Sequence, residues 1–333
     1  MEHTPLLQVE NLKKYYPVKG GLITHTVGHV HAVDDVSFTL NAGETLGLVG
    51  ESGCGKSTVG RQIVGLETPT AGRILYNGAD LNAMSARELA GVRTQLQMVF
   101  QDSFSSLNPR KHIFEVLSAP MLHHGLATKA NVEQRVDRLL ELVGLPKSAK
   151  TRYPHEFSGG QRQRIGIARA LSLEPRLIVC DEPVSALDVS IQAQILNLFC
   201  DLQKELGLTY LFIGHCLAAV NYVSDRIAVM YLGQLVEIAD ADELFANPVH
   251  PYTQALFDAA PVPDPEDKGR KGILLRGEIG SAIDPPVGCR FASRCPHACG
   301  ACRAAQPPLV PIAPGSTHLA ACPVAIQHRK EGV

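Results

Sequence analysis

The chain has 333 residues, enough for one large domain and a smaller one, each with its own core. A hydrophobic content of 45% and a charged content of 19% are typical of globular proteins and exclude a chain that is disordered throughout. The net charge of -2 excludes the strongly basic field that holds nucleic acid by its phosphates, so we expect no nucleic-acid partner.

No membrane-spanning or secretion segment is expected. The sequence has no run of about 18 apolar residues, the length at which a transmembrane helix would be suspected. The first residues, Met1–Lys14, lack the apolar stretch of a signal peptide. We therefore expect a soluble, cytosolic chain, in which the nine cysteines are thiols or metal ligands rather than disulfides.

Short apolar stretches separated by glycine and proline predict strands in the N-terminal part of the chain. These stretches are Leu6–Leu12, Val30–Leu40, Thr45–Val49, Arg73–Tyr76 and Leu96–Phe100. From Ile113 to Val143 the apolar residues recur at helical spacing, which predicts a mostly helical insert. Strand patterns return at Leu177–Cys180 and Tyr210–Ile213 beside helical patterns, so we expect parallel strands with crossover helices and an α/β core.

A glycine-rich loop, Gly-Glu-Ser-Gly-Cys-Gly-Lys-Ser over Gly50–Ser57, follows the apolar strand Leu46–Val49. This is a P-loop pattern in its required context, before a helical pattern; the preceding strand disfavours an accidental match. Its inward N–H groups and the positive end of the helix favour bound phosphate. We expect Lys56 to reach the β- and γ-phosphates and Ser57 to ligate magnesium. The residues expected at the nucleotide are Gly50, Ser52, Gly53, Cys54, Gly55, Lys56, Ser57 and Thr58.

Two carboxylates, Asp181 and Glu182, follow the apolar strand Leu177–Cys180. A parallel strand delivers such side chains to a nucleotide at its C-terminal edge. We expect Asp181 to hold magnesium and Glu182 to orient and deprotonate the attacking water, as general base. The pair alone would also suit an ordinary charged turn, and the P-loop upstream favours the catalytic interpretation.

The segment Phe157–Gln161 resembles the signature motif of ABC ATPases, with phenylalanine in the first place. Ser158 suits an N-cap, and the helix Gln161–Leu171 would aim its positive end outward, as at the P-loop. The resemblance implies that two ATPase units meet head to tail, each ATP lying between one P-loop and the other unit's signature. The signature residues expected to contact ATP are Ser158, Gly159, Gly160 and Gln161. A capped helix with a glycine-rich entrance is the plainer alternative.

The resemblance also implies an ABC-type core over residues 1–245: a parallel sheet, an antiparallel β subdomain and a helical subdomain at about 102–175. Tyr16 resembles the aromatic residue that stacks on adenine, although Tyr15 is an alternative. Gln101 resembles the Q-loop glutamine that senses magnesium and γ-phosphate. Asp188 belongs to a D-loop-like segment that would touch the opposite subunit, and it is expected among the residues at ATP. His215 resembles the switch histidine that contacts the γ-phosphate.

The switch segment departs from the family pattern. Peptide-importer relatives usually have Ser-His-Asp here, whereas this chain has Gly214-His215-Cys216. The missing carboxylate puts in doubt how firmly His215 is oriented and whether hydrolysis runs at the usual rate. A regulatory, weakly hydrolysing subunit is therefore an alternative. ABC proteins that act on ribosomes or DNA usually carry paired cassettes or a long coiled-coil insertion, and this sequence has neither.

Nearly the whole chain resembles the ATPase subunits of bacterial oligopeptide and dipeptide importers. The stretches that carry this resemblance are Gln101–Arg110, Arg152–Phe157, Asn247–Thr253 and the cysteine-bearing tail. It implies uptake of peptides, or of nickel chelates or another small solute. Residues 246–333 would form the importers' C-terminal extension, and 13 of the 22 prolines do fall between Pro248 and Pro323. So proline-rich a segment buries little apolar surface and usually needs a staple.

Four tail cysteines could supply that staple. Cys289, Cys295, Cys302 and Cys322 are separated by five, six and nineteen residues. In importers of this class such a tail is associated with an iron–sulfur cluster, so the resemblance implies a [4Fe–4S] site at these four positions. Cys299 is an additional cysteine. Only Cys299 with Cys302 has the close pairing that structural zinc prefers, and zinc and free thiols remain the alternatives.

The resemblance finally implies partners and a location. ATP and magnesium would be the cofactors of a transport-coupled ATPase at the cytoplasmic face of the inner membrane. Two membrane-spanning permease subunits, a second ATPase subunit, related or identical, and an extracytoplasmic solute-binding protein would be separate chains.

Overall fold

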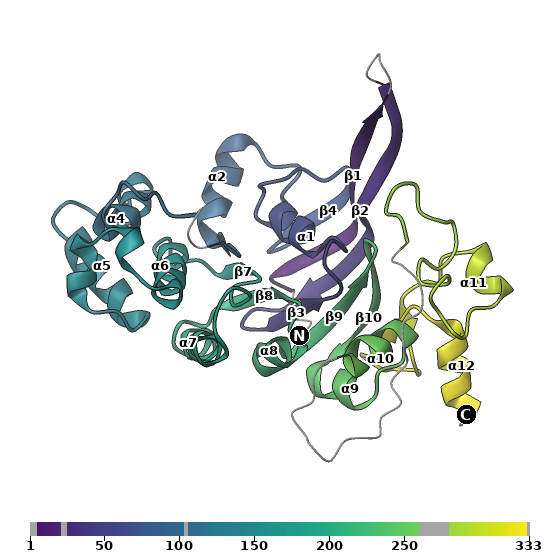
Figure 1. The fold of residues 1–333 in the computed structure, drawn as a ribbon. Coiled ribbons are helices and arrows are strands. Elements are labelled where there is room, and N and C mark those ends of the chain that lie inside the picture. The colour runs from purple at the N-terminus through teal and green to yellow at the C-terminus, as the bar shows by residue number, and fades with distance from the viewer. Residues whose placement is uncertain (1–4, 21–24, 103–105, 260–279, 332–333) are drawn as a thin grey trace.

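The computed structural model describes residues 5–20, 25–102, 106–259 and 280–331. A helical lobe built on α4, α5 and α6 lies on one side, two sheets fill the centre, and the C-terminal extension lies on the opposite side (Figure 1). The strands are β1 (Leu7–Gly20), β2 (His25–Leu40), β3 (Thr45–Val49), β4 (Ala71–Tyr76), β5 (Ala79–Asp80), β6 (Leu96–Val99), β7 (Leu177–Asp181), β8 (Thr209–Gly214), β9 (Arg226–Tyr231), β10 (Gln234–Asp240), β11 (Val310–Pro311) and β12 (Leu319–Ala320).

The helices alternate with these strands over most of the chain. They are α1 (Lys56–Ile63), α2 (Ala86–Gln95), α4 (Ile113–His123), α5 (Val132–Leu142), α6 (Gly159–Leu171), α7 (Val189–Leu206), α8 (Leu217–Val223), α9 (Ala241–Ala246), α10 (Pro251–Asp258), α11 (Gly300–Ala304) and α12 (Pro323–Glu331). Two short 3-10 helices, Lys147–Thr151 and Pro154–Glu156, precede α6. Residues 103–105 of the Q-loop-like stretch and 260–279 of the expected extension lie outside the described residues.

The main sheet confirms the predicted α/β class. Its strand order is β11-β12-β10-β9-β3-β8-β7-β6, and the strands from β9 to β6 pair in parallel. Every residue of β3, β7 and β8 is buried, because helices cover the sheet, and this explains their uninterrupted apolar runs. Val49 lies beside Gly214, and Asp181 beside Ile213, so the loops that carry the expected site residues leave from one edge.

A second, antiparallel sheet has the order β2-β1-β4-β5. Its strands β1 and β2 continue well past the apolar stretches predicted from the sequence and pair from Leu7 with Leu40 to Gly20 with His25. Cross-strand hydrogen bonds hold this far part of the hairpin, so it requires no apolar run. The antiparallel β subdomain implied by the family resemblance is present.

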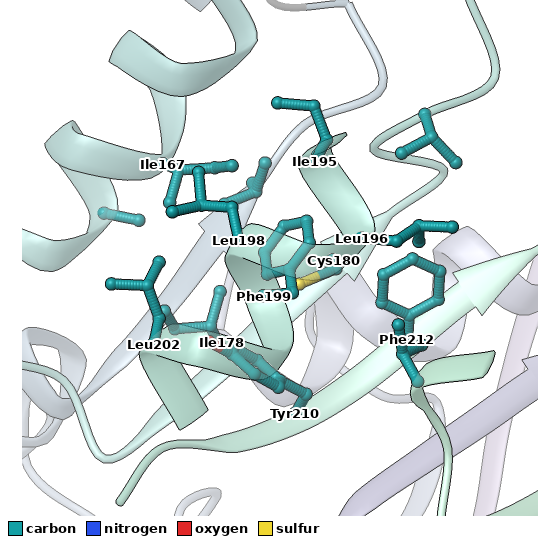
Figure 2. Packing of buried hydrophobic residues seen from close by; sticks show 14 of the residues in the cluster. Ile167, Ile178, Cys180, Ile195, Leu196, Leu198, Phe199, Leu202, Tyr210 and Phe212 are labelled. Atoms are coloured by element: carbon teal, nitrogen blue, oxygen red, sulfur yellow. The ribbon is translucent and has the colours of Figure 1, made fainter. Parts of the chain in front are cut away.

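The helical lobe has the amphipathic face that the sequence predicts. Val132, Val136, Leu139 and Leu140 of α5 are buried. On the sheet itself, Phe199 of α7 meets Tyr210 and Phe212 edge-on, with ring centroids 5.4 and 5.7 Å apart (Figure 2). This packing holds β8, the strand that leads to the switch histidine.

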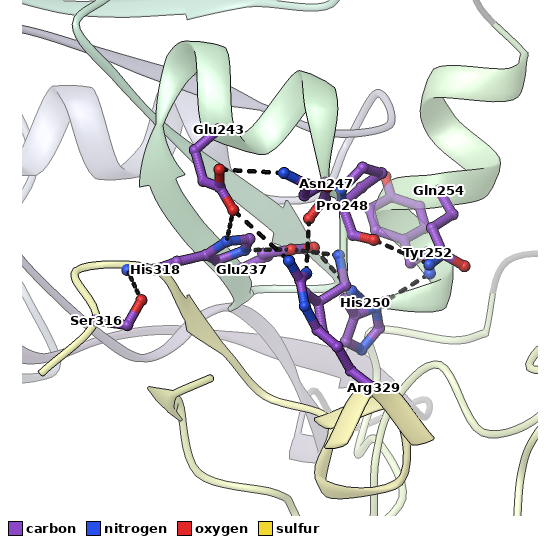
Figure 3. A network of polar contacts seen from close by, with 11 residues as sticks. Glu237, Glu243, Asn247, Pro248, His250, Tyr252, Gln254, Ser316, His318 and Arg329 are labelled. Carbon is purple, nitrogen blue, oxygen red and sulfur yellow. Dashed lines mark hydrogen bonds and ion pairs between the residues drawn. The ribbon is translucent and has the colours of Figure 1, made fainter. Parts of the chain in front are cut away.

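The C-terminal extension is joined to the main sheet by strand pairing and by buried polar contacts. Strand β12 pairs with β10, placing Ala320 opposite Glu237. Glu237 is fully buried, and its carboxylate accepts hydrogen bonds from the backbone N–H groups of Val249 and His250 at 2.7 and 2.9 Å (Figure 3). Nε2 of buried His318 lies 2.7 Å from the same carboxylate. A buried polar cluster thus fastens a segment that has little apolar surface of its own.

Candidate nucleotide-binding and catalytic site

The phosphate-binding loop, residues 50–57, links β3 to α1 and depends on glycine for its path. Gly50 and Gly55 have φ angles of 152° and 108°. A Cβ atom at Gly50 would lie 2.1 Å from the carbonyl oxygen of Met230, and one at Gly55 would lie 2.0 Å from that of Ala32. Neighbouring backbone therefore touches the loop at these two positions, and larger residues would displace it.

Lys56 and Ser57 begin helix α1 at the end of this loop. Lys56 is buried, and its Nζ donates to the carbonyl oxygens of Gly50 and Glu51 at 2.8 and 3.0 Å. The hydroxyl of Ser57 donates to Oδ1 of Asp181 at 2.7 Å. Burial raises the pKa of Asp181, partly offset by this hydrogen bond. A divalent cation would stabilise the ionised carboxylate, so the Ser57–Asp181 pair suits magnesium.

Three residues distant in sequence meet at the carboxylate of Glu182. Nε2 of Gln101 donates to its Oε2 at 3.1 Å, and Nδ1 of His215 lies 3.1 Å from the same oxygen. Glu182 itself has a φ of 46°, an unusual left-handed conformation for a glutamate, and its N–H donates to the carbonyl oxygen of Ile213 at 2.9 Å. The structure thus brings together Glu182, Gln101 and His215, the residues that the sequence predicts for water activation, the Q-loop and the switch.

The cysteine that replaces the family aspartate lies at the start of α8. Cys216 is exposed and makes no side-chain capping hydrogen bond at this N-cap position. His215 is more than half exposed and takes its contact from Glu182 instead. The contact partner of His215 is therefore Glu182, the residue that the sequence predicts as the general base.

The two adjacent tyrosines of β1 differ in their surroundings. Tyr15 stacks on His31, and its hydroxyl donates to Asp34 at 2.5 Å. Tyr16 is 36% exposed, and its hydroxyl donates to Glu67. Nζ of Lys14 lies 5.2 Å from the centroid of the Tyr16 ring. Successive side chains of a strand point to opposite faces, which explains why the two rings have different surroundings. The exposed ring of Tyr16 is the one left available for an adenine base.

The signature segment is the N-terminus of α6. Ser158 caps it: its hydroxyl accepts from the N–H of Gln161 at 3.4 Å, while the Gln161 side chain accepts from the N–H of Ser158 at 3.1 Å. A Cβ at Gly160 would lie 2.5 Å from Ile191, so a small residue is needed there. This end of α6 belongs to the helical lobe, separate from α1 (Figure 1).

Asp188 is the N-cap residue of α7, beside the signature helix. It is exposed, and the following Val189 is 82% exposed, a large fraction for an apolar side chain. Leu187 lies 3.5 Å from the position of a Cβ at Gly159. The D-loop-like and signature-like segments therefore form one continuous surface.

Sequence reasoning missed the contacts behind the phosphate-binding loop. Nη1 of Arg294 lies 3.1 and 3.0 Å from the two carboxylate oxygens of Glu51. The hydroxyl of Tyr252 accepts from the N–H of Glu51 at 2.9 Å. In the sequence, Tyr252 is notable only as part of Asn247–Thr253, a stretch that carries the resemblance to the importer subunits. An acidic residue inside a phosphate-binding loop was the available signal that a basic partner lies nearby.

The four expected cluster cysteines line one pocket in the extension, together with Phe291: Cys289, Cys295, Cys302 and Cys322. Burial and the neighbouring thiols raise the pKa of Cys322 to about 11. Cys299 is exposed, and its Sγ lies 3.3 Å from that of Cys302. Thiolates are the ligands that soft metals prefer. Within the described residues, however, no group of three or more histidine, cysteine or acidic side chains is arranged to hold a metal ion.

Within the described residues, no helix combines the length and the apolar character that crossing a bilayer demands.

Two family models match the chain. One, described as ABC transporter, matches residues 33–185. The other, described as oligopeptide/dipeptide transporter, C-terminal region, matches residues 236–302. The oligopeptide transport ATP-binding protein AppF of Bacillus subtilis (strain 168) is 52% identical over 319 residues, covering 95% of this chain and 96% of the relative. The putative oligopeptide transport ATP-binding protein YkfD of the same strain is 52% identical over 317 residues, covering 95% and 94%.

Solved structures agree with these matches. The cbiO1 protein from Clostridium perfringens, described as part of the ABC transporter complex cbiONQ, has a TM-score of 0.63 at 27% identity, covering 73% of this chain and 91% of that one. The ATP-binding cassette MJ0796, in a dimeric post-hydrolysis state bound to ADP and Pi, has a TM-score of 0.62 at 26% identity, covering 71% and 98%.

Proposed function

The chain belongs to the ABC transporter ATP-binding proteins that carry the oligopeptide/dipeptide C-terminal region, and we propose that it hydrolyses ATP to power the import of di- or oligopeptides. The names of relatives that are 52% identical over nearly the whole chain support the peptide substrate. Import of nickel chelates or another small solute is the alternative cargo, because no residue of this subunit is expected to contact the solute.

The observation that carries the hydrolytic function is the cluster around Glu182. Its carboxylate lies 3.1 Å from both Gln101 and His215, at the end of the strand that also presents Asp181 to Ser57. We assign Glu182 the role of general base, holding and deprotonating the attacking water. Gln101 and His215 position that carboxylate and would contact the γ-phosphate.

The phosphate-binding loop would hold the triphosphate. Lys56 now donates to the carbonyl oxygens of Gly50 and Glu51, and we infer that its Nζ turns from them to the β- and γ-phosphates when ATP binds. Ser57, Asp181 and Gln101 would hold magnesium, which would neutralise negative charge on the phosphates. Tyr16 offers its exposed ring to the adenine.

The exposed signature and D-loop surface supports a two-subunit arrangement. Ser158, Gly159, Gly160 and Gln161 form a capped helix N-terminus on α6 in the helical lobe, whereas the phosphate-binding loop leads into α1. Such an end attracts phosphate, so we propose that it contacts the ATP of a second ATPase subunit, identical or related. The exposed Asp188 and Val189 would then lie at the subunit boundary.

The transporter would require further chains. We propose two membrane-spanning permease subunits, with this subunit bound to them at the cytoplasmic face of the membrane, and an extracytoplasmic solute-binding protein that delivers the peptide. ATP-driven closure of the two ATPase subunits would move the helical lobes against the permeases. The family match supports this arrangement.

The cysteine pocket is a candidate for the iron–sulfur cluster implied by the family resemblance. Cys289, Cys295, Cys302 and Cys322 would be the ligands, because these four thiols line the pocket. A cluster there would cross-link three separate parts of the extension. Zinc and free thiols remain alternatives, and iron, sulfide and zinc analysis of protein purified without oxygen would separate the three.

ATP turnover by the complex reconstituted with its permeases tests the hydrolytic role. Glu182→Gln should lower kcat by at least about a hundredfold, since general-base catalysis contributes roughly that factor or more. Cys216 in place of an aspartate favours a second candidate, a regulatory subunit that binds ATP but hydrolyses it weakly. A wild-type rate already as low as that of Glu182→Gln would support this regulatory subunit and overturn the enzyme assignment.

A further inference from the structure

The segment between Cys289 and Cys295 packs against the back of the phosphate-binding loop. It carries two arginines whose side chains are almost fully buried, Arg290 at 5% exposure and Arg294 at 7%. Neither lines the cysteine pocket, and both contact acidic partners in the ATPase core, Asp34 and Glu51. Burying a guanidinium is costly unless it is paired, so these contacts are specific features of the fold.

Arg294 forms an ion pair with Glu51, the second residue of the phosphate-binding loop. Its Nη1 lies 3.1 and 3.0 Å from the two carboxylate oxygens. The N–H of Glu51 donates to the hydroxyl of Tyr252 at 2.9 Å, and its carbonyl oxygen accepts from Lys56 at 3.0 Å. Two of the three polar groups of this residue are therefore held by the extension, and the third by the lysine expected to bind phosphate.

Arg290 supports the same loop from its other side. It donates to the carbonyl oxygen of Leu232 and to the carboxylate of Asp34. The adjacent Gly233 donates its N–H to the carbonyl oxygen of Cys54, within the loop, at 2.8 Å. Arg290 is thus linked to the phosphate-binding loop through the turn at Leu232 and Gly233, with one hydrogen bond on each of these two residues.

The contact between Arg294 and Glu51 matters because it compensates a negative charge in the phosphate-binding loop. A carboxylate in a loop that binds a triphosphate would repel the ligand, and removing its cationic partner would leave that charge uncompensated in a partly buried place. We propose that Arg294 is a positioning residue of the ATP site: it neutralises Glu51 and holds the loop in its binding conformation, with Arg290 supporting it. This inference rests on the proposed binding of ATP at residues 50–57.

The test is an equilibrium titration of the purified full-length chain with a fluorescent ATP analogue and magnesium, which requires no hydrolysis. Arg294→Met, which keeps most of the apolar stem, should weaken binding about tenfold, the effect of losing one charge-assisted contact. Adding Glu51→Gln to Arg294→Met should recover most of that loss, because the uncompensated charge is then gone. Arg303→Met alters an exposed arginine of the same extension and should bind as the wild type does.

Two results would overturn the proposal: wild-type affinity in Arg294→Met, or a double variant as weak as Arg294→Met alone. In the reconstituted complex, Arg294→Met should raise the KM for ATP and leave kcat nearly unchanged, whereas general loss of structure would lower both kcat and the unfolding temperature. Failure of the function itself would look different, because the wild-type chain would then not bind the analogue, or would bind it equally well after Lys56→Ala.

Discussion

Acid should destabilise the joint between the ATPase core and the extension through one buried histidine, His250. This residue caps helix α10, and its Nδ1 accepts a hydrogen bond from the N–H of Tyr252 at 3.1 Å. Burial lowers the pKa of His250 from 6.5 to about 4, although nearby Glu237 acts in the opposite direction. Protonation would cost the capping hydrogen bond and would place a charge in the interior.

The magnitude follows from proton linkage. Above pH 6.5 the histidine is neutral in both the folded and the unfolded chain, so it contributes no pH dependence. Between pH 6.5 and about 4 the unfolded chain binds a proton that the folded chain rejects, and the free energy of unfolding falls as the pH falls. Over this window the loss amounts to about 3 kcal/mol, and below pH 4 it levels off.

Urea denaturation at a series of pH values would measure this loss. The reference is His250→Asn, because asparagine does not titrate and its side-chain oxygen can still cap α10. Subtracting the variant's unfolding free energy from the wild type's removes the acid sensitivity of the carboxylates that both proteins share. Relative to that of His250→Asn, the unfolding free energy of the wild type should fall by about 3 kcal/mol as the pH falls to 4. A difference that stays constant with pH would refute the reasoning.

Two further substitutions probe the extension and the loop. Glu237→Ala should lower the free energy of unfolding by about 3 kcal/mol or more, because it leaves two buried N–H groups and His318 without their acceptor. Urea denaturation would measure this loss, and Glu237→Gln should lose less stability than Glu237→Ala. Gly55→Ala should weaken ATP-analogue binding by more than about tenfold, since its Cβ would lie 2.0 Å from the carbonyl oxygen of Ala32. Unchanged affinity would mean that the loop shifts freely.

Local patterns were sufficient for the core of the fold. The run Leu177–Cys180 lacks polar alternation because both faces of β7 are covered, and so it could be identified as a central parallel strand. The positive φ angles of Gly50 and Gly55 and the cap of Ser158 are likewise local requirements of turns and helix starts, although the contacts of Met230 and Ala32 with these glycines arise only in the folded chain. These features depend on neighbours in the sequence, which explains why composition and spacing were enough.

Other features required the folded chain. The far half of the β1–β2 hairpin has little apolar character and exists because its two strands pair with each other. The sequence left Tyr15 and Tyr16 as alternatives, and only their surroundings distinguish them: Tyr15 stacks on His31 and donates to Asp34, whereas Tyr16 is 36% exposed.

The sequence by itself determined which chemical groups are present and which short segments carry them: a phosphate-binding loop, an acidic strand end and a glycine-rich helix start. The tertiary structure decided which of these groups meet. Glu182 contacts a histidine 33 positions away, and Arg294 reaches Glu51 across 243 positions. Such contacts depend on how the sheet edge and the extension pack, and packing energy is spread over many residues that no local pattern records.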